Sequence, residues 1–415
     1  MLALAMSAGA QNGVATPLKV RPDAFPPEVE TTESKAIMMA ETVDEMASWD
    51  RYPTYETYVA MMQQWAASYP GLCRLDTIGT SLMGRLILAL HIEGTRDAGN
   101  QHPQFFYSST IHGDEVTGYV MMLRLIDTLL TSYGNDPRLT DLVDATAIYI
   151  NPLANPDGTY FRGNASVQGA LRYNARFIDL NRNYPDPFGG VSVKNLEQEN
   201  EAMIAYVAAH QFRLSANLHG GSEVMNYPWD CFTSAQNPHP AADWWNEVGR
   251  RFVDTCRRYD NERFRDVIAN GVIAGGDWYV IHGGRQDYMN YFHHCLEMTM
   301  EVSSVKLLPS ERLPDYWHAL SHALINYIDE IHSLPEWVGV EAPTLADGAP
   351  LRVFPNPVAD CLRVDGVEQG EVLTLYDLYG RRLKESVGER VDMSDLPAGV
   401  YTLRSGQRSV KVIKK

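Results

Sequence analysis

Short apolar segments alternate along this chain with longer segments whose apolar residues recur at helical spacing. The short segments, which are typical of buried strands, are Leu86–Ile92, Phe105–Ser109, Ala145–Ile150, Leu214–His219 and Leu296–Val302. The helical segments are Tyr55–Tyr69, Val116–Leu130, Glu197–His210, Asp243–Tyr259 and Arg312–Ile331. This alternation predicts an α/β fold with a mixed, mainly parallel sheet flanked by helices. Ligands of such a sheet collect in the loops at the C-terminal ends of its strands.

The alternation stops at a stretch rich in Pro, Gly and Ala, which predicts a linker over residues 335–350. Beyond it, short strand-like segments (Leu373–Leu378, Val400–Leu403 and Val410–Ile413) are separated by turns at Tyr379-Gly380 and Pro397-Ala398-Gly399. Residues 351–415 therefore predict a small all-β sandwich domain. Residues 48–334 form the main domain in this division of the chain.

The N-terminal residues indicate processing and export. Residues 1–10 are short and apolar and end in Ala8-Gly9-Ala10, which predicts a truncated signal peptide. Residues 11–47, rich in Pro, Glu and Thr, predict a linker or a short pro-segment. No stretch approaches the roughly 18 continuous apolar residues of a membrane span.

Charge and cysteine content exclude some classes of function. The formal net charge is −17 and the pI is about 5.1, which argue against nucleic acids and anionic membranes as partners. The five cysteines contain no CxxC pair and no zinc-knuckle spacing, so they do not form a metal site.

Two histidines and a glutamate have the pattern of a hydrolytic metal site. His112 and Glu115 follow a predicted strand and open a predicted helix, a junction where both side chains can reach one cation. His219 ends another apolar strand and is followed by two glycines. A single histidine there can also be an ordinary core residue, but as a third ligand it completes a His₂Glu set with one position open for water. A second HxxE pattern, His294 to Glu297, enters a strand where residues three apart point to opposite faces, and we interpret it as accidental.

Further motifs occur in a fixed order along the chain. They are HGDE (112–115), NPDG (155–158), DLNRNYP (179–185), HGG (219–221), NYPWD (226–230), WY (278–279), GGRQD (283–287) and EMTMEV (297–302). With these motifs, residues 50–333 resemble the funnelin-type zinc carboxypeptidases, most closely the carboxypeptidase N, E and D subgroup that cuts basic C-terminal residues. The resemblance implies a secreted, zinc-dependent metallocarboxypeptidase with a preference for C-terminal Lys or Arg.

The resemblance also implies roles for single residues. One zinc ion would be held by His112, Glu115 and His219, with Asp179 orienting the first of these ligands. The catalytic residues would be Glu301 as general base and Arg172 beside the scissile carbonyl. Substrate binding would fall to Asn181, Arg182 and Tyr279 at the terminal carboxylate and to Asp230 at the cationic side chain. Simpler interpretations stay open for four of these residues: turn chemistry for Asn181, Arg182 and Asp230, and packing for Tyr279.

Two other functions fit the same residues. One is a hydrolase of cell-wall peptides or γ-linked amides that uses the same zinc site. The other is a catalytically inactive surface protein that binds peptides.

The C-terminal residues carry a resemblance of their own. The elements PNP (355–357), YDLYG (376–380) and LPAGVY (396–401) are similar to the sorting domains of bacterial type IX secretion substrates. This resemblance implies export across the outer membrane by the bacterial secretion machinery and a secreted or cell-surface location. The partners expected are thus peptide or protein C-termini and that machinery.

Overall fold

The structure is a computed structural model of the 415-residue chain. It describes residues 37–94, 102–187, 195–335, 351–367, 370–377, 381–406 and 408–415. The expected signal peptide, residues 11–36 and nearly all of the expected linker after Pro335 lie outside the described residues.

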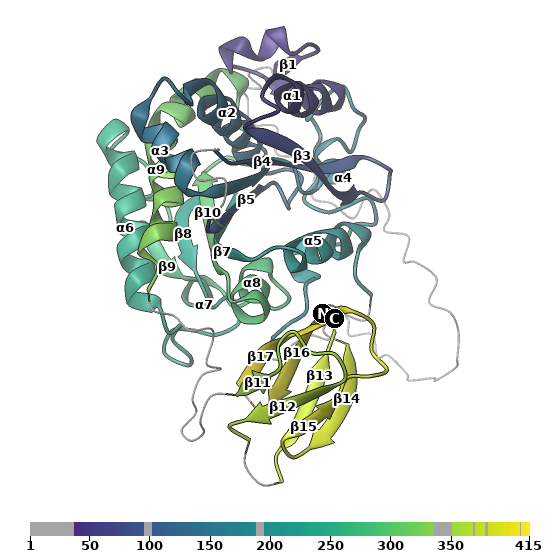
Figure 1. The fold of residues 1–415 in the computed structure, drawn as a ribbon. Coiled ribbons are helices and arrows are strands. Elements are labelled where there is room, and N and C mark those ends of the chain that lie inside the picture. The colour runs from purple at the N-terminus through teal and green to yellow at the C-terminus, as the bar shows by residue number, and fades with distance from the viewer. Residues whose placement is uncertain are drawn as a thin grey trace, which may run out of the picture. The chain divides into compact units, whose positions relative to one another are not determined.

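A mixed sheet of eight strands forms the centre of the main domain (Figure 1). Its order is β3-β4-β6-β5-β7-β10-β8-β9. Four neighbouring pairs are parallel (β6–β5, β5–β7, β7–β10 and β8–β9), and three are antiparallel (β3–β4, β4–β6 and β10–β8). The predicted α/β fold with a mainly parallel sheet is therefore confirmed. The strands are β3 Cys73–Thr80, β4 Leu86–Ile92, β5 Gln104–Ser109, β6 Ala147–Asn151, β7 Phe212–His219, β8 Ser222–Tyr227, β9 Val272–Ala274 and β10 Leu296–Ser303.

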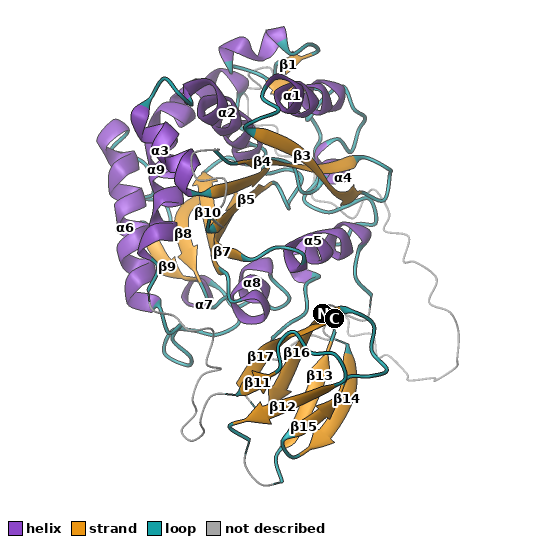
Figure 2. Ribbon diagram, viewed as in Figure 1, coloured by secondary structure: helices purple, strands orange, loops and turns teal. Residues whose placement is uncertain are grey.

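Helices cover both faces of this sheet (Figure 2). The larger hydrophobic core lies beneath α1 (Tyr55–Ser68), α2 (Thr117–Ser132), α3 (Pro137–Ala145), α6 (Ala242–Tyr259) and α9 (Leu313–Asp329). A smaller core on the opposite face lies beneath α5 (Gln198–Ala208) and α8 (Arg285–His293). Short helices connect these elements: α4 Pro156–Thr159, α7 Gly275–Trp278, η2 Asp44–Ser48, η3 Leu180–Arg182, η4 Ser310–Arg312 and η5 Glu330–Ser333.

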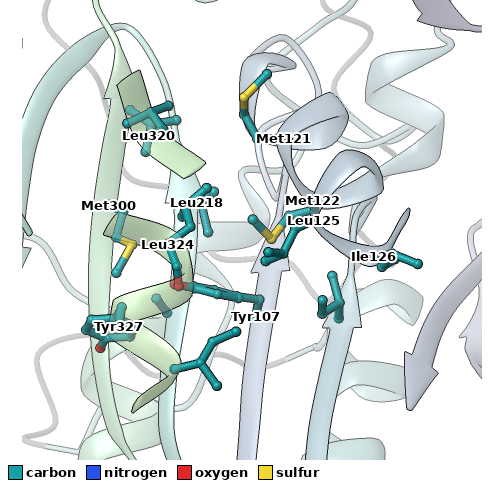
Figure 3. Packing of buried hydrophobic residues seen from close by; sticks show 14 of the residues in the cluster. Tyr107, Met121, Met122, Leu125, Ile126, Leu218, Met300, Leu320, Leu324 and Tyr327 are labelled. Atoms are coloured by element: carbon teal, nitrogen blue, oxygen red, sulfur yellow. The ribbon is translucent and has the colours of Figure 1, made fainter. Parts of the chain in front are cut away.

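The larger core shows why the central strands read as continuously apolar. On β5, Tyr107 packs beneath α2 and α9 in the larger core (Figure 3). Its neighbour Phe106 packs in the smaller core on the other face. Both faces are buried, so neither shows the polar alternation of a half-exposed strand. The hydroxyl groups of two tyrosines in the larger core donate to backbone oxygens: Tyr107 to Leu324 (2.9 Å) and Tyr327 to Ser215 (3.0 Å).

Several elements lack a strong apolar pattern and were not predicted. Strands β3 and β8 and helices α3 and α8 carry many polar residues. Residues 37–47, assigned from the sequence to a linker or pro-segment, form β1 (Met39–Ala40) and most of η2. Strand β1 pairs in parallel with β2 (Tyr52–Pro53), and Ala40 and Met46 are buried in the larger core. The folded domain therefore starts at least as early as these residues.

Residues 351–415 form an all-β unit with a hydrophobic core of its own. One antiparallel sheet has the order β11-β12-β15 and the other the order β14-β13-β16-β17. Both sheets contribute side chains to the same core, as in a sandwich. The predicted turn at Tyr379-Gly380 lies outside the described residues. The strands are β11 Arg352–Phe354, β12 Cys361–Asp365, β13 Val372–Tyr376, β14 Arg382–Val387, β15 Arg390–Asp392, β16 Gly399–Ser405 and β17 Arg408–Lys414.

Two general features complete the description. All five cysteines lie among the described residues and are free thiols. In the part of the chain that the structure describes, no helix combines the length and the apolar character needed to cross a bilayer.

Candidate active site

A sharp turn after β5 brings the first two candidate ligands together. Thr110 leaves the strand with φ of +63°, a left-handed conformation that is unusual for a β-branched residue. Its N–H donates to the carbonyl oxygen of Leu218 (3.3 Å), and its hydroxyl donates to that of Glu115 (3.3 Å). These two hydrogen bonds join the start of the turn to its end at Glu115 and to the end of β7, next to His219.

His112, Glu115 and His219 meet at this point. The Nδ1 atoms of the two histidines lie 3.0 Å apart. Oε2 of Glu115 lies 3.0 Å from Nδ1 of His112 and 2.8 Å from Nδ1 of His219. Each of the three residues is 3 % exposed. Two imidazole nitrogens and a carboxylate oxygen that converge in a buried place form a donor set that fits zinc.

The pKa values of two of the three groups suit metal binding. At His112 burial opposes the charge, but Glu115 and Asp179 outweigh burial and raise the pKa of His112, whose proton a metal ion would have to displace. Burial opposes the charge of Glu115, but the neighbouring imidazoles of His112 and His219 outweigh it and hold the pKa of Glu115 well below its usual value. Burial lowers the pKa of His219 to about 4, so its ring is neutral at physiological pH. A neutral imidazole and an ionised carboxylate are the forms that bind metal ions.

The far side of His112 is held by Asp179. Nε2 of His112 lies 3.1 Å from Oδ1 of Asp179, which also accepts the N–H of Asn181 (2.9 Å). Nε of Arg172 donates to the other oxygen of Asp179 (3.0 Å). A proton on Nε2 of His112 leaves Nδ1 free as a ligand. Asp179 is thus placed to orient the His112 ring, the role that the family resemblance implies for it.

Asn217 occupies the corresponding position beside His219 and was not predicted. Its side-chain Nδ2 lies 2.9 Å from Nε2 of His219, while its Oδ1 is buried without a hydrogen-bond partner in the described structure. Rotation of this amide by half a turn would present Oδ1 to the Nε2–H of His219 and so leave Nδ1 as the ligand. Its place two residues before His219 was the available signal, because alternate strand residues share a face.

Lys306 is a second residue that the sequence did not predict. Its Nζ lies 3.1 Å from Oε1 of Glu115 and 3.2 Å from Oδ2 of Asp114. Nη1 of Arg172 lies 3.3 Å from the same Oε1, and the N–H of Gly220 donates to Oε2 (3.3 Å). The two cations hold the outer oxygen of Glu115, so Oε2 faces the histidines.

A small pocket opens beside the three candidate ligands. Five of the residues predicted for the site contribute to its lining: Arg172, Asn181, Asp230, Tyr279 and Glu301. Arg182 instead donates through Nη1 to the carbonyl oxygen of its neighbour Asn181 (2.9 Å). The full lining is His112, Arg172, Asn181, His219, Asn226, Asp230, Tyr279, Ile281, Thr299 and Glu301.

The structure separates the two glutamates of β10. Glu301 stands opposite His219 in the parallel register and reaches the pocket. Glu297 is fully buried and pairs with Arg285 of α8 (3.1 Å). Burial, and then the charge of Glu115, raise the pKa of Glu301 well above its usual value. Its Oε2 is buried and has no hydrogen-bond partner among the described residues.

Asp230 lies in the same pocket and is 4 % exposed. Nε2 of Gln286 donates to its Oδ1 (2.9 Å). Burial, and then the nearby carboxylate of Asp287, raise the pKa of Asp230 well above its usual value. The pocket therefore contains a buried carboxyl group without a cation in contact with it among the described residues, and a ligand with a positive charge would complement it.

Comparisons with known proteins agree with this fold and identify a family. A family model described as zinc carboxypeptidase matches residues 58–322, and one described as a secretion system C-terminal sorting domain matches residues 352–415. Carboxypeptidase M of Mus musculus is 33% identical over 322 residues, 75% of this chain and 71% of that protein.

Two further proteins extend the comparison. Carboxypeptidase D of Mus musculus is 32% identical over 297 residues, 68% of this chain but only 21% of that protein, so the chain spans about a fifth of its length. A crystal structure of thrombin activatable fibrinolysis inhibitor (TAFI) superimposes with a TM-score of 0.61 at 17% identity, covering 69% of this chain and 76% of that one, which shows a shared fold.

Substitution of the two glutamates of β10 should affect the free energy of unfolding differently. In metal-free protein we expect Glu297→Gln to lower the free energy of unfolding by about 3–5 kcal/mol, because it leaves the buried Arg285 without its partner. Glu301→Gln should leave that free energy unchanged or raise it. The folded state holds the Glu301 proton more tightly than the unfolded chain does, so at neutral pH the ionised group costs stability.

Urea unfolding in the presence of a chelator measures both changes. Equal effects of the two substitutions would contradict this distinction.

Proposed function

Because the chain belongs to the zinc carboxypeptidase family, we propose that it hydrolyses the last peptide bond of a polypeptide and prefers Lys or Arg at that end. The observation that carries the proposal is one pocket that joins three converging metal donors to a buried carboxyl group at Asp230. The decisive test is the turnover of matched peptides ending in Arg, Lys, Phe and Glu, with and without a chelator.

One zinc ion bound by His112, Glu115 and His219 is the proposed cofactor. When bound, zinc polarises the scissile carbonyl and lowers the pKa of a water molecule towards about 7. Asp179 and Asn217 would keep the two imidazoles in the orientation that presents Nδ1. Lys306 and Arg172 would do the same for Glu115 by holding its outer oxygen.

Glu301 is the proposed general base. It faces the pocket from the end of β10, directly beside His219, and its Oε2 makes no hydrogen bond within the described residues. A carboxylate whose pKa is raised takes a proton from water more readily and can pass that proton to the leaving amine. Arg172, 26% exposed and facing the same pocket, would stabilise the oxyanion, a type of contact worth roughly 3–4 kcal/mol of barrier per donor.

Asn181, Arg182 and Tyr279 are proposed to bind the terminal carboxylate. Asn181 lies in the pocket wall, and Tyr279, 48% exposed, stands at the rim. An Arg fork suits this task because it can meet a carboxylate with two parallel hydrogen bonds. Arg182 donates through Nη1 to the Asn181 carbonyl oxygen, which uses one of the five N–H donors of its guanidinium group.

The buried carboxyl group of Asp230 supports a cationic terminal residue over an acidic one. An acidic side chain would bring a second negative charge into a place that already disfavours the first. This argues against substrates whose terminal residue is acidic. The complete set of ligands, base and arginine likewise supports an active enzyme over an inactive peptide binder.

Residues 351–415 are proposed to serve export. The match to a secretion sorting domain over residues 352–415 supports recognition by bacterial secretion machinery and a secreted or cell-surface location. The self-contained core of this unit is consistent with a module that can be removed without damage to the catalytic domain.

Zinc content should depend on the histidine ligands. We expect about one zinc per chain in the purified protein, and its loss or marked weakening in His112→Ala and His219→Ala, because each change removes one of three protein ligands. Elemental analysis measures the content. An absence of zinc in the wild type, or full occupancy in both variants, would refute the assignment.

Turnover should depend on Glu301 and not on Glu297. Glu301→Gln should keep zinc and lower kcat by about 10²–10⁴-fold, because a base acts on the proton and not on metal affinity. Glu297→Gln, assayed at a temperature where it remains folded, should keep most of the activity. Equal losses of kcat in two folded variants would leave the base unidentified and count against this role.

Selectivity should depend on Asp230. Asp230→Ala should lower kcat/KM for Arg-ending peptides by about 30-fold or more, because a desolvated charge pair loses one partner. Activity on Phe-ending peptides should change far less. The preference should persist at high salt, since contact in a buried pocket is weakly screened. An unchanged Arg preference in the variant would show that this residue has another role.

The C-terminal unit should be dispensable for catalysis and required for export. A chain that ends near Glu336 should fold and keep its kcat/KM, but it should remain inside the bacterial cells that produce it. Cell fractionation and peptidase assays measure the two effects. An inactive or unfolded truncated protein would contradict the division of the chain.

A further inference from the structure

Two residues of the GGRQD motif, Gln286 and Asp287, and the earlier Gly275 lie against Asp230. We propose that Asp287 is a positioning residue, acting together with Gly275, that fixes the Asp230 carboxylate in the pocket and thereby sets the preference for a cationic terminal residue. The inference rests on the proposed function, because it explains how that function obtains its selectivity.

Asp287 holds the backbone at Asp230. Its Oδ1 accepts the N–H of Asp230 (2.9 Å), and its Oδ2 accepts the N–H of Cys231 (3.0 Å). The carbonyl oxygen of Asp230 accepts the N–H of Ile281 (3.0 Å). Both backbone polar groups of Asp230 are therefore bound by the segment from Ile281 to Asp287, which fixes the direction in which its side chain leaves the chain.

Gln286 and Gly275 then fix the side chain itself. Oε1 of Gln286 accepts the N–H of Thr299 on β10 (2.6 Å), so its amide group must point Nε2 towards Oδ1 of Asp230 (2.9 Å). On the other side, a Cβ atom at Gly275 would lie 1.9 Å from the same Oδ1. The Asp230 carboxylate thus packs directly against the Gly275 backbone, in space that any side chain at position 275 would take.

An aspartate at position 287 provides two acceptor oxygens and a negative charge, and an asparagine provides neither. Two backbone N–H groups need two acceptors, and an asparagine would turn its own NH₂ group towards one of them. Burial raises the pKa of Asp287 to about 6, yet two donors favour its ionised form at neutral pH. The charge of Asp287 also lies close to Asp230 and adds to the attraction for a cation. Geometry and charge therefore act in the same direction.

The test compares kcat/KM for two matched peptides, one ending in Arg and one in Phe, in the full-length zinc-loaded protein. Asp287→Asn should lower the Arg/Phe ratio about 10-fold or more, mainly through a higher KM for the Arg peptide, while kcat/KM for the Phe peptide stays within about 3-fold. Gly275→Ala should change the ratio in the same direction, because its methyl group displaces the Asp230 carboxylate.

Two control substitutions match these variants. Asp315→Asn changes another aspartate in the first turn of a helix, one whose side chain is 65% exposed. Gly71→Ala adds a methyl group where no atom lies within 4 Å. Both should leave the Arg/Phe ratio unchanged.

The outcomes are distinct. A parallel loss on both peptides, or an unchanged ratio in a folded Asp287→Asn, would assign Asp287 a merely structural role and overturn the inference. If Asp287→Asn does not fold, Gly275→Ala decides by the same ratio. A wild type without any Arg preference refutes the proposed substrate preference, and this is visible before any variant is measured.

Discussion

The parallel pairing of β7 with β10 is the constraint on which the site depends. It sets His219 opposite Glu301 at the carboxyl end of the sheet, so a candidate ligand and a candidate base stand side by side. The neighbouring strand β5 ends at the same edge, and the left-handed Thr110 turns the chain so that His112 and Glu115 reach the same point. A shift of β10 by one residue would send Glu301 to the helix-covered face of the larger core.

Buried charge is distributed unevenly around this edge. Beside the metal donors, Asp179 and Glu115 are offset by Arg172 and Lys306. Glu297 below them is offset by Arg285. At Asp230 and Asp287 two carboxyl groups lie close together, held by neutral donors such as the Gln286 amide and backbone N–H groups. Among the described residues these two carboxyl groups make no ion pair, although the charge of Arg182 acts on Asp230, so a cationic side chain that enters here would gain a direct partner.

The chain combines two units with separate cores, one for the proposed chemistry and one that matches a sorting domain. The buried apolar residues of the C-terminal unit pack against one another within residues 351–415. A unit of this kind can direct a protein to export without contributing residues to the catalytic pocket, whose lining comes from the main domain.

The sequence by itself determined the fold class and the central strands, and its motifs named several residues that the structure brings to one pocket. Strands buried on both faces and amphipathic helices leave strong apolar patterns, and the motifs from HGDE to EMTMEV identified the candidate ligands, Glu301 and Asp230. Polar elements such as β8 and α8 escaped prediction because their burial comes from neighbours distant in the chain.

Only the tertiary structure decided which charges meet. Glu297 and Glu301 share a strand face, and periodicity alone does not distinguish them; the resemblance favoured Glu301, and α8 pairs the other glutamate with Arg285. Four residues without a role in the sequence-based prediction contact the site from separate segments: Asn217, Lys306, Gln286 and Asp287. A contact of this kind depends on three-dimensional distance and burial, which a linear pattern of residues does not encode.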